Sequence, residues 1–65
     1  MNIAERIKEY RGRTDCTQVE MAQKLGITQP ALQGYETGAN KPKTMNAIKL
    51  ANLLGITVEE LMKEE

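Results

Sequence analysis

Apolar residues recur along the chain at spacings of three and four, in short segments separated by polar residues and glycines. Ile3, Ile7 and Tyr10 form the first such stripe. This spacing places apolar side chains on one face of a helix, whereas a half-buried strand needs a period of two, and no segment shows that alternation. The pattern therefore predicts an all-α fold of five short helices without a sheet.

Three capping boxes mark where helices begin. In each box an Asn or Thr precedes a Glu by three residues, so that each side chain can bond the backbone N–H of the other residue. The boxes are Asn2 with Glu5, Thr17 with Glu20, and Thr57 with Glu60. They predict the starts of the first, second and fifth helices. The first helix is expected to fade near Gly12 and Arg13, before Asp15 adopts a left-handed turn conformation.

The third helix is expected to begin after Thr28. Pro30 then lies in its first turn, where a missing N–H costs little. Because Pro30 removes one of the two amides that a cap can reach, Thr28 is expected to bond the amide of Ala31. Residues 38–42 form a loop by composition, and a fourth helix covers about residues 44–54.

The same spacing predicts which residues of the last two helices face the core. In the fourth helix they are Ala47, Ile48, Leu50, Ala51 and Leu54. In the last helix, Val58 and Leu61 are expected to face the core, with Met62 beside them.

Residues 18–37 have the features of a helix-turn-helix, in which three or four residues containing a glycine join two helices and the second helix is presented outward. Ala22 is small where the two helices would cross, and Gly26 permits the tight turn. The apolar underside is expected to comprise Met21, Leu25, Ile27, Leu32 and Tyr35. With one helix before it and two after it, this motif predicts a single DNA-binding domain over residues 1–65.

The most informative segment is Thr17–Gln29, which reads TQVEMAQKLGITQ. Together with Tyr35–Gly38, Pro42 and Leu50–Leu61, it resembles the Cro and phage-repressor class of helix-turn-helix domains, also called the xenobiotic-response-element family. The resemblance implies a lambda-repressor-like fold of five helices. It also implies sequence-specific regulation of transcription, as a repressor that binds operator DNA as a dimer.

Three roles in that family carry over onto matching residues. Gln18 resembles a glutamine that meets a DNA phosphate at the positive end of its helix dipole. Gln29 resembles a base-reading glutamine, whose amide can bond both N6 and N7 of adenine. Arg11 and Glu36 coincide with a structural ion pair that bridges the first helix to the end of the third. From the residues alone, this pair is either exposed and of little energetic weight or partly buried.

The expected base-reading face is sparse. Its residues are Gln29, Pro30, Ala31, Gln33 and Gly34. Pro30 can donate nothing, so we expect it and Ala31 to contact thymine methyl groups, while Gln33 either reads a base or is simply solvated. Gly34 stands where the family often has a polar residue, and it costs about 1 kcal/mol relative to alanine in a helix interior. Close approach of its backbone to DNA, close approach to a partner, and simple drift would each account for it.

Residues expected to face DNA phosphates flank this surface. They are Gln18, Thr28, Asn40, Lys41 and Lys43. Such contacts position a protein on DNA without specifying sequence. The alternative for Lys41 and Lys43 is that they only make the loop soluble. Lys43 also stands where the family often has a serine cap, which is expected to shift the cap of the fourth helix to Thr44.

The charge balance is unusual for a DNA-binding protein, because nine basic and nine acidic residues give a net charge of zero. Residues 1–58 carry eight basic and five acidic side chains, a net charge of +3. The acidic end carries Glu59, Glu60, Glu64 and Glu65 against Lys63. Long-range attraction to phosphates should therefore be weak. This balance supports an alternative hypothesis, a protein-interaction helical module such as an antitoxin-like or adaptor domain.

Composition narrows the remaining classes. Cys16 is the only cysteine and histidine is absent, so neither an internal disulfide nor a metal site is expected, and Cys16 is expected to be a buried core thiol. No nucleophile stands beside a base, so we predict no enzyme, cofactor or small-molecule ligand. No stretch approaches the roughly 18 apolar residues of a membrane span, and the start lacks a signal-peptide pattern, so a cytoplasmic protein encoded by a bacterium or phage is expected. A homodimer is expected through the C-terminal helix, with Val58, Leu61 and Met62 as its apolar surface.

Overall fold

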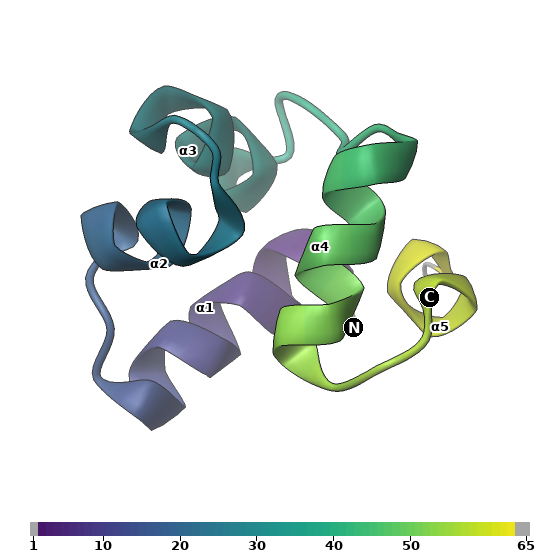
Figure 1. Ribbon diagram of the computed structural model, residues 1–65, viewed down its shortest axis with the longest axis horizontal. Helices are drawn as coiled ribbons and strands as arrows, with labels where there is room; N and C mark the ends of the chain where they lie inside the picture. Colours follow the sequence, from purple (N-terminus) through teal and green to yellow (C-terminus); the bar gives the residue numbers. More distant parts are fainter. Residues whose placement is uncertain (1, 64–65) are drawn as a thin grey trace.

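The computed structural model describes residues 2–63, and every regular element in that range is a helix. The helices are α1 (Ile3–Thr14), α2 (Gln18–Leu25), α3 (Gln29–Thr37), α4 (Thr44–Leu54) and α5 (Val58–Met62), as Figure 1 shows. The predicted all-α class and the order of five helices are confirmed. Within the described range, no helix is both long enough and apolar enough to cross a bilayer. Glu64 and Glu65, assigned to the acidic end of the chain, lie outside the described residues.

The helix starts follow the predicted capping residues in four of five cases. All three capping boxes form, and at the start of α3 the Thr28 Oγ1 accepts the Ala31 N–H at 3.3 Å. The predicted shift of the α4 cap to Thr44 is wrong, because Lys43 is the extended N-cap residue and Thr44 is already helical. Since a lysine side chain carries no acceptor, α4 begins without a side-chain cap.

Four helices end with one residue in the left-handed conformation. These residues are Asp15 at φ 54°, Gly26 at φ 69°, Gly38 at φ 81° and Gly55 at φ 73°. After Asp15, Gly26 and Gly55, the next N–H donates to a carbonyl five residues back at 3.0 Å, as the Cys16 N–H does to the Arg11 carbonyl. The predicted turn at Asp15 is therefore confirmed, and it directs the chain sharply from α1 into α2.

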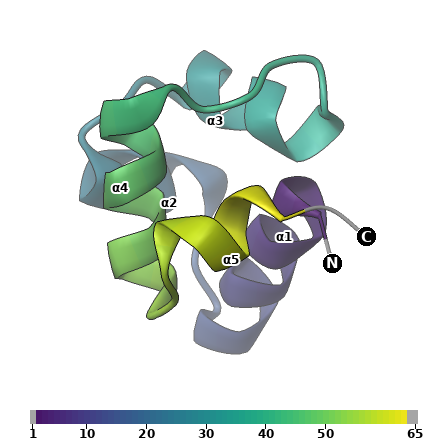
Figure 2. The same ribbon diagram turned by 90° about the vertical axis from the view of Figure 1, so that its right-hand side faces the viewer.

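The core lies between all five helices. Both α1 and α2 pack against α3, and α4 packs against α2 and α5. The largest fully buried side chains are Ile7, Met21, Leu32, Leu50 and Leu61. Cys16 is buried with a free thiol, as predicted. This packing leaves α3 and the loop that follows it at one edge of the molecule, at the top of both Figure 1 and Figure 2.

Three residues predicted to face the core are exposed instead. Ile48 is 41% exposed, Val58 37% and Met62 45%. Ile48 follows Ala47, which α4 buries, and a step of one residue turns a side chain by about 100° around a helix. The five residues of α5 bury only Leu61. The surface over α4 and α5 is therefore more apolar than predicted.

Candidate nucleic-acid interface

The helix-turn-helix predicted for residues 18–37 is present as α2, a tight turn and α3. Leu32 and Tyr35 hold the inner face of α3 in the core. Gln29, Pro30 and Gln33 are exposed on that helix. A helix that is anchored on one face and open on the other has the geometry needed to enter the major groove of DNA.

The first residues of α2 and α3 are joined by a hydrogen bond between their side chains. The Gln29 Nε2 donates to the Gln18 Oε1 at 3.0 Å. A glutamine amide carries two N–H donors and one carbonyl acceptor, so Gln29 keeps one N–H and its carbonyl oxygen for a further partner. The bond therefore orients the Gln29 amide and leaves it able to pair with a base.

Gly34 is buried, and the prediction that it faces outward is wrong. The side chain of Asn40, which comes from the loop after α3, occupies the space beside the Gly34 Cα, and a Cβ there would lie 3.2 Å from the Asn40 Cγ. Ala31 is half-buried at the margin of the exposed face. Of the predicted base-reading residues, Gln29, Pro30 and Gln33 therefore form the outward row of α3, with Ala31 at its border.

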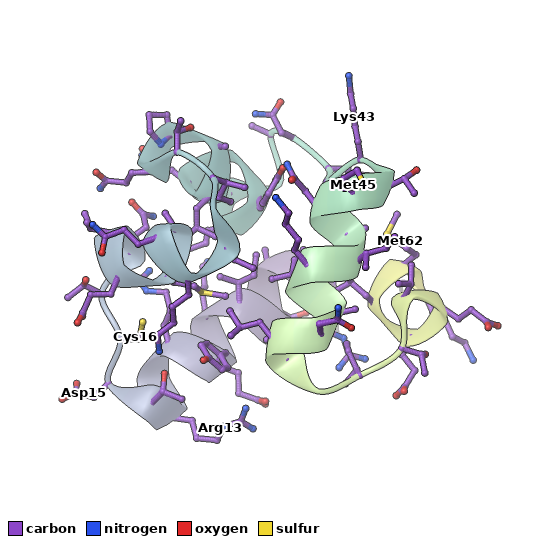
Figure 3. All side chains as sticks on the ribbon, viewed as in Figure 1. Arg13, Asp15, Cys16, Lys43, Met45 and Met62 are labelled. Carbon is purple, nitrogen blue, oxygen red and sulfur yellow. The ribbon has the colours of Figure 1, made fainter. Side chains whose placement is uncertain are left out.

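A hollow of about 330 Å³ separates α3 from the start of α4. It is lined by Ala31, Tyr35, Asn40, Lys41, Lys43 and Asn46. Three of these, the two lysines and Asn40, are the loop residues predicted to meet phosphates, and the fold brings them next to α3. Figure 3 shows the Lys43 side chain extending away from the body of the protein at the edge that α3 occupies.

Thr28 and Gln18 lie at the starts of α3 and α2. The Thr28 oxygen accepts the cap bond from Ala31, so its O–H is left as a donor. Near Gln18, the Thr17 N–H donates to Glu20 at 2.9 Å. This bond, together with the hydrogen bond from the Thr17 side chain to the Glu20 carboxylate, lowers the pKa of Glu20 below its ordinary value. The ionised Glu20 partly offsets the positive end of α2, where a phosphate would be expected.

Asn46 is a residue that the sequence analysis missed. Its Nδ2 donates to the Tyr35 hydroxyl at 2.9 Å and so ties α3 to α4. Helical spacing predicts Tyr35 in the core but gives no signal for the partner of its hydroxyl, because Asn46 lies eleven residues away, beyond a loop. A buried tyrosine needs a hydrogen-bond partner at its polar end, and Asn46 supplies it.

Arg11 and Glu36 form the expected bridge between α1 and α3. The Arg11 Nη1 lies 2.8 Å from the Glu36 Oε2, and the two side chains are 28% and 9% exposed. The pair is therefore partly buried, which decides between the two alternatives that the residues alone left open. Because Glu36 is the second-last residue of α3, the pair fixes that end of the helix against α1.

A family model described as helix-turn-helix matches residues 7–61. The chain is 39% identical over 63 residues to the uncharacterized HTH-type transcriptional regulator YqaE of Bacillus subtilis, covering 97% of this chain and 54% of that protein. It is 36% identical over 61 residues to the cryptic phage CTXphi transcriptional repressor RstR of Vibrio cholerae, covering 94% of this chain and 54% of that protein. It is 34% identical over 65 residues to the HTH-type transcriptional regulator ImmR of Bacillus subtilis, covering 100% of this chain and 51% of that protein.

The chain spans about half the length of these relatives. No solved structure gives a significant match. The family match begins inside α1 and ends inside α5, so it includes the whole helix-turn-helix and the helices that support it. The chain therefore belongs to the Cro and phage-repressor class of helix-turn-helix proteins.

Proposed function

We propose that this domain binds double-stranded DNA and regulates transcription as a repressor, with α3 in the major groove of an operator. The observation that carries the proposal is the exposed row of Gln29, Pro30 and Gln33 on a helix whose other face is held in the core. The names of the relatives, HTH-type transcriptional regulators and a phage transcriptional repressor, support the same function.

Base reading rests on few side chains. Gln29 pairs with adenine through the N–H and carbonyl oxygen that its bond to Gln18 leaves unused. Gln33, one turn further along α3, reads a second base. Pro30 and Ala31 contribute apolar contact to thymine methyl groups. Because one copy has two polar side chains that read bases, its discrimination between sequences is modest. A dimer would double the free energy of that discrimination.

Phosphate contacts flank the reading row on both sides. Gln18 and Thr28 contact the backbone at the starts of α2 and α3, and Asn40, Lys41 and Lys43 contact it from the hollow beside α3. Because the net charge of the chain is zero, these local contacts and not a long-range field supply the electrostatic part of the affinity.

For a dimer, we propose a surface that departs from the predicted one at Leu61. Leu61 is fully buried and so cannot contact a second copy, whereas Met45 is 68% exposed at the start of α4. Met45 and Met62 lie on the same side of the molecule in Figure 3, the side that α4 and α5 form. We propose that the surface of Met45, Ile48, Val58 and Met62 joins two copies on neighbouring half-sites.

An amide chemical-shift map of the labelled protein, titrated with a mixed-sequence duplex at low salt, tests DNA binding. We expect shifts of the backbone amides at residues 28–33 and 40–43, apart from Pro30 and Pro42, which carry no N–H. These shifts should disappear as salt is raised, because phosphate contacts make affinity fall steeply with salt. Shifts confined to α1, or no shifts at all, would contradict the proposal. Such a result would favour the protein-interaction alternative, which the comparisons do not support.

The family assignment supports the prediction that the chain is not an enzyme. That the protein is cytoplasmic and is encoded by a bacterium or a phage stays a prediction.

A further inference from the structure

Gly34 and Asn40 are locked together where α3 meets its following loop. A Cβ built on Gly34 would collide with the Asn40 Nδ2, and would lie 3.2 Å from the Asn40 Cγ and 3.3 Å from its Cβ. The whole Asn40 side chain, and not only its flexible end, therefore rests on the surface that a side chain at position 34 would occupy. Only glycine, which has no Cβ, leaves this space free for Asn40.

The backbone holds the two residues together as well. The Asn40 N–H donates to the Gly34 carbonyl at 3.1 Å. The Thr37 hydroxyl donates to the same carbonyl at 3.3 Å, and the Ala39 N–H donates to the Thr37 hydroxyl at 3.4 Å. These bonds tie the loop down onto the last turn of α3, so Asn40 cannot move away from Gly34 by a simple backbone shift.

Asn40 also lines two hollows. One is the hollow of about 330 Å³ that contains Lys41 and Lys43. The other, of about 170 Å³, lies against the start of α1 and shares Tyr35, Asn40 and Lys41 with the first. The packing of Asn40 on Gly34 therefore affects the shape of both hollows and the start of the segment that carries Lys41 and Lys43.

We propose that Gly34 is a positioning residue for phosphate binding. It reads no base itself. Because Gly34 has no side chain, Asn40 can pack against α3. This packing fixes the distance between Gln29 and Gln33, which read bases, and the phosphate-binding loop of Asn40, Lys41 and Lys43. This inference rests on the proposed DNA-binding function, and it gives a reason for a glycine in the interior of α3.

The test compares Gly34→Ala with the wild-type chain on two duplexes, one selected for tight binding and one of mixed sequence. We expect Gly34→Ala to weaken binding to both duplexes by a similar factor, of the order of ten-fold. The plot of log affinity against log salt should become less steep, by about 0.9 in slope for each phosphate that the variant no longer binds. Unchanged affinity would overturn the inference, and so would a loss limited to the selected duplex, because that pattern belongs to a base-reading residue.

Gly12 provides a matched control. It is a glycine within α1, and a Cβ there meets no atom within 4 Å. Gly12→Ala should raise the melting temperature by up to about 8 °C through helix propensity alone and leave DNA affinity unchanged. Gly34→Ala should show no comparable rise, because the displaced Asn40 offsets the gain. A rise equal to that of Gly12→Ala would overturn the inference.

A double-mutant cycle with Asn40→Ala completes the test. Asn40→Ala removes the Nδ2 and Cγ atoms that crowd position 34. In that background Gly34→Ala should have little further effect on affinity and should raise the melting temperature much as Gly12→Ala does. Additive losses would overturn the inference. If the wild-type chain binds neither duplex, the proposed function fails. If the wild-type chain binds and Gly34→Ala matches it, only the role of Gly34 fails.

Discussion

One guanidinium nitrogen of Arg11, Nη1, donates to both carboxylate oxygens of Glu36, at 2.9 and 2.8 Å. The Nε of the same side chain donates to the Cys16 carbonyl at 3.2 Å. Arg11 therefore joins α1, the turn into α2 and the end of α3 in one cluster of hydrogen bonds. This cluster fixes the end of α3 against α1 and the turn into α2.

Breaking this pair should cost far more than an exposed ion pair is worth. Arg11→Met leaves the buried Glu36 carboxylate without its partner, and we expect a loss of about 3 kcal/mol or more in the free energy of unfolding. Adding Glu36→Leu should recover much of the loss, because no isolated charge then remains. Denaturant unfolding of the two single variants and the double variant measures the coupling.

Arg13→Met is the control for that cycle. Arg13 lies 3.9 Å from Glu9 in an exposed pair, so its replacement should change the stability by less than about 1 kcal/mol. Strictly additive losses for Arg11 and Glu36 would show that the two side chains are not coupled.

Gln29→Ala should relax the preference for one base pair. The bidentate pairing that this change removes is worth about 1 to 3 kcal/mol of discrimination against other bases. Competition binding with duplexes that vary one position at a time measures this preference. Gln23→Ala, which removes an exposed glutamine of α2 outside the proposed interface, should leave every preference intact. An equal loss on all duplexes for Gln29→Ala would exclude base reading by this residue.

Lys43→Ala should weaken binding to all sequences alike. Loss of one phosphate contact makes the plot of log affinity against log salt less steep, by about 0.9 in slope. Arg13→Ala removes the same charge at the end of the molecule opposite Lys43 in Figure 3, and it should leave the slope unchanged. If both variants shift the slope equally, Lys43 acts only through net charge and does not contact a phosphate.

Ile48→Gln with Met62→Gln should separate dimer formation from DNA contact. Neither change alters the charge, so binding of one copy to a half-site duplex should match the wild type. On a duplex with two half-sites, sedimentation should show two copies of the wild-type chain bound together. Copies of the variant should instead bind one at a time. Joint binding by the variant would exclude the proposed surface on α4 and α5.

The parts of the fold that the sequence predicts are those fixed by local interactions. Capping boxes, the turn at Asp15 and the Thr28 cap involve residues a few positions apart, so their spacing alone predicts them. The exposure of Ile48 and Val58 depends on how a short α5 packs against α4, which local spacing does not determine.

The candidate site divides in the same way. The family pattern predicts Gln18, Gln29 and the Arg11–Glu36 bridge, because each lies at a fixed place in the helix-turn-helix or in the helix before it. The burial of Gly34 depends on Asn40, a residue that returns to α3 from the loop. No periodicity along the chain indicates such a return, so the reason for a glycine within α3 became visible only in three dimensions.

Selection from a pool of random duplexes at low salt, followed by a salt titration of the enriched sequence, tests the central claim most directly. We expect an enriched sequence with an adenine that Gln29 reads, and an affinity that falls steeply as salt rises. Failure to enrich any sequence, together with the absence of a salt-dependent complex, would contradict the claim that α3 of this domain reads DNA.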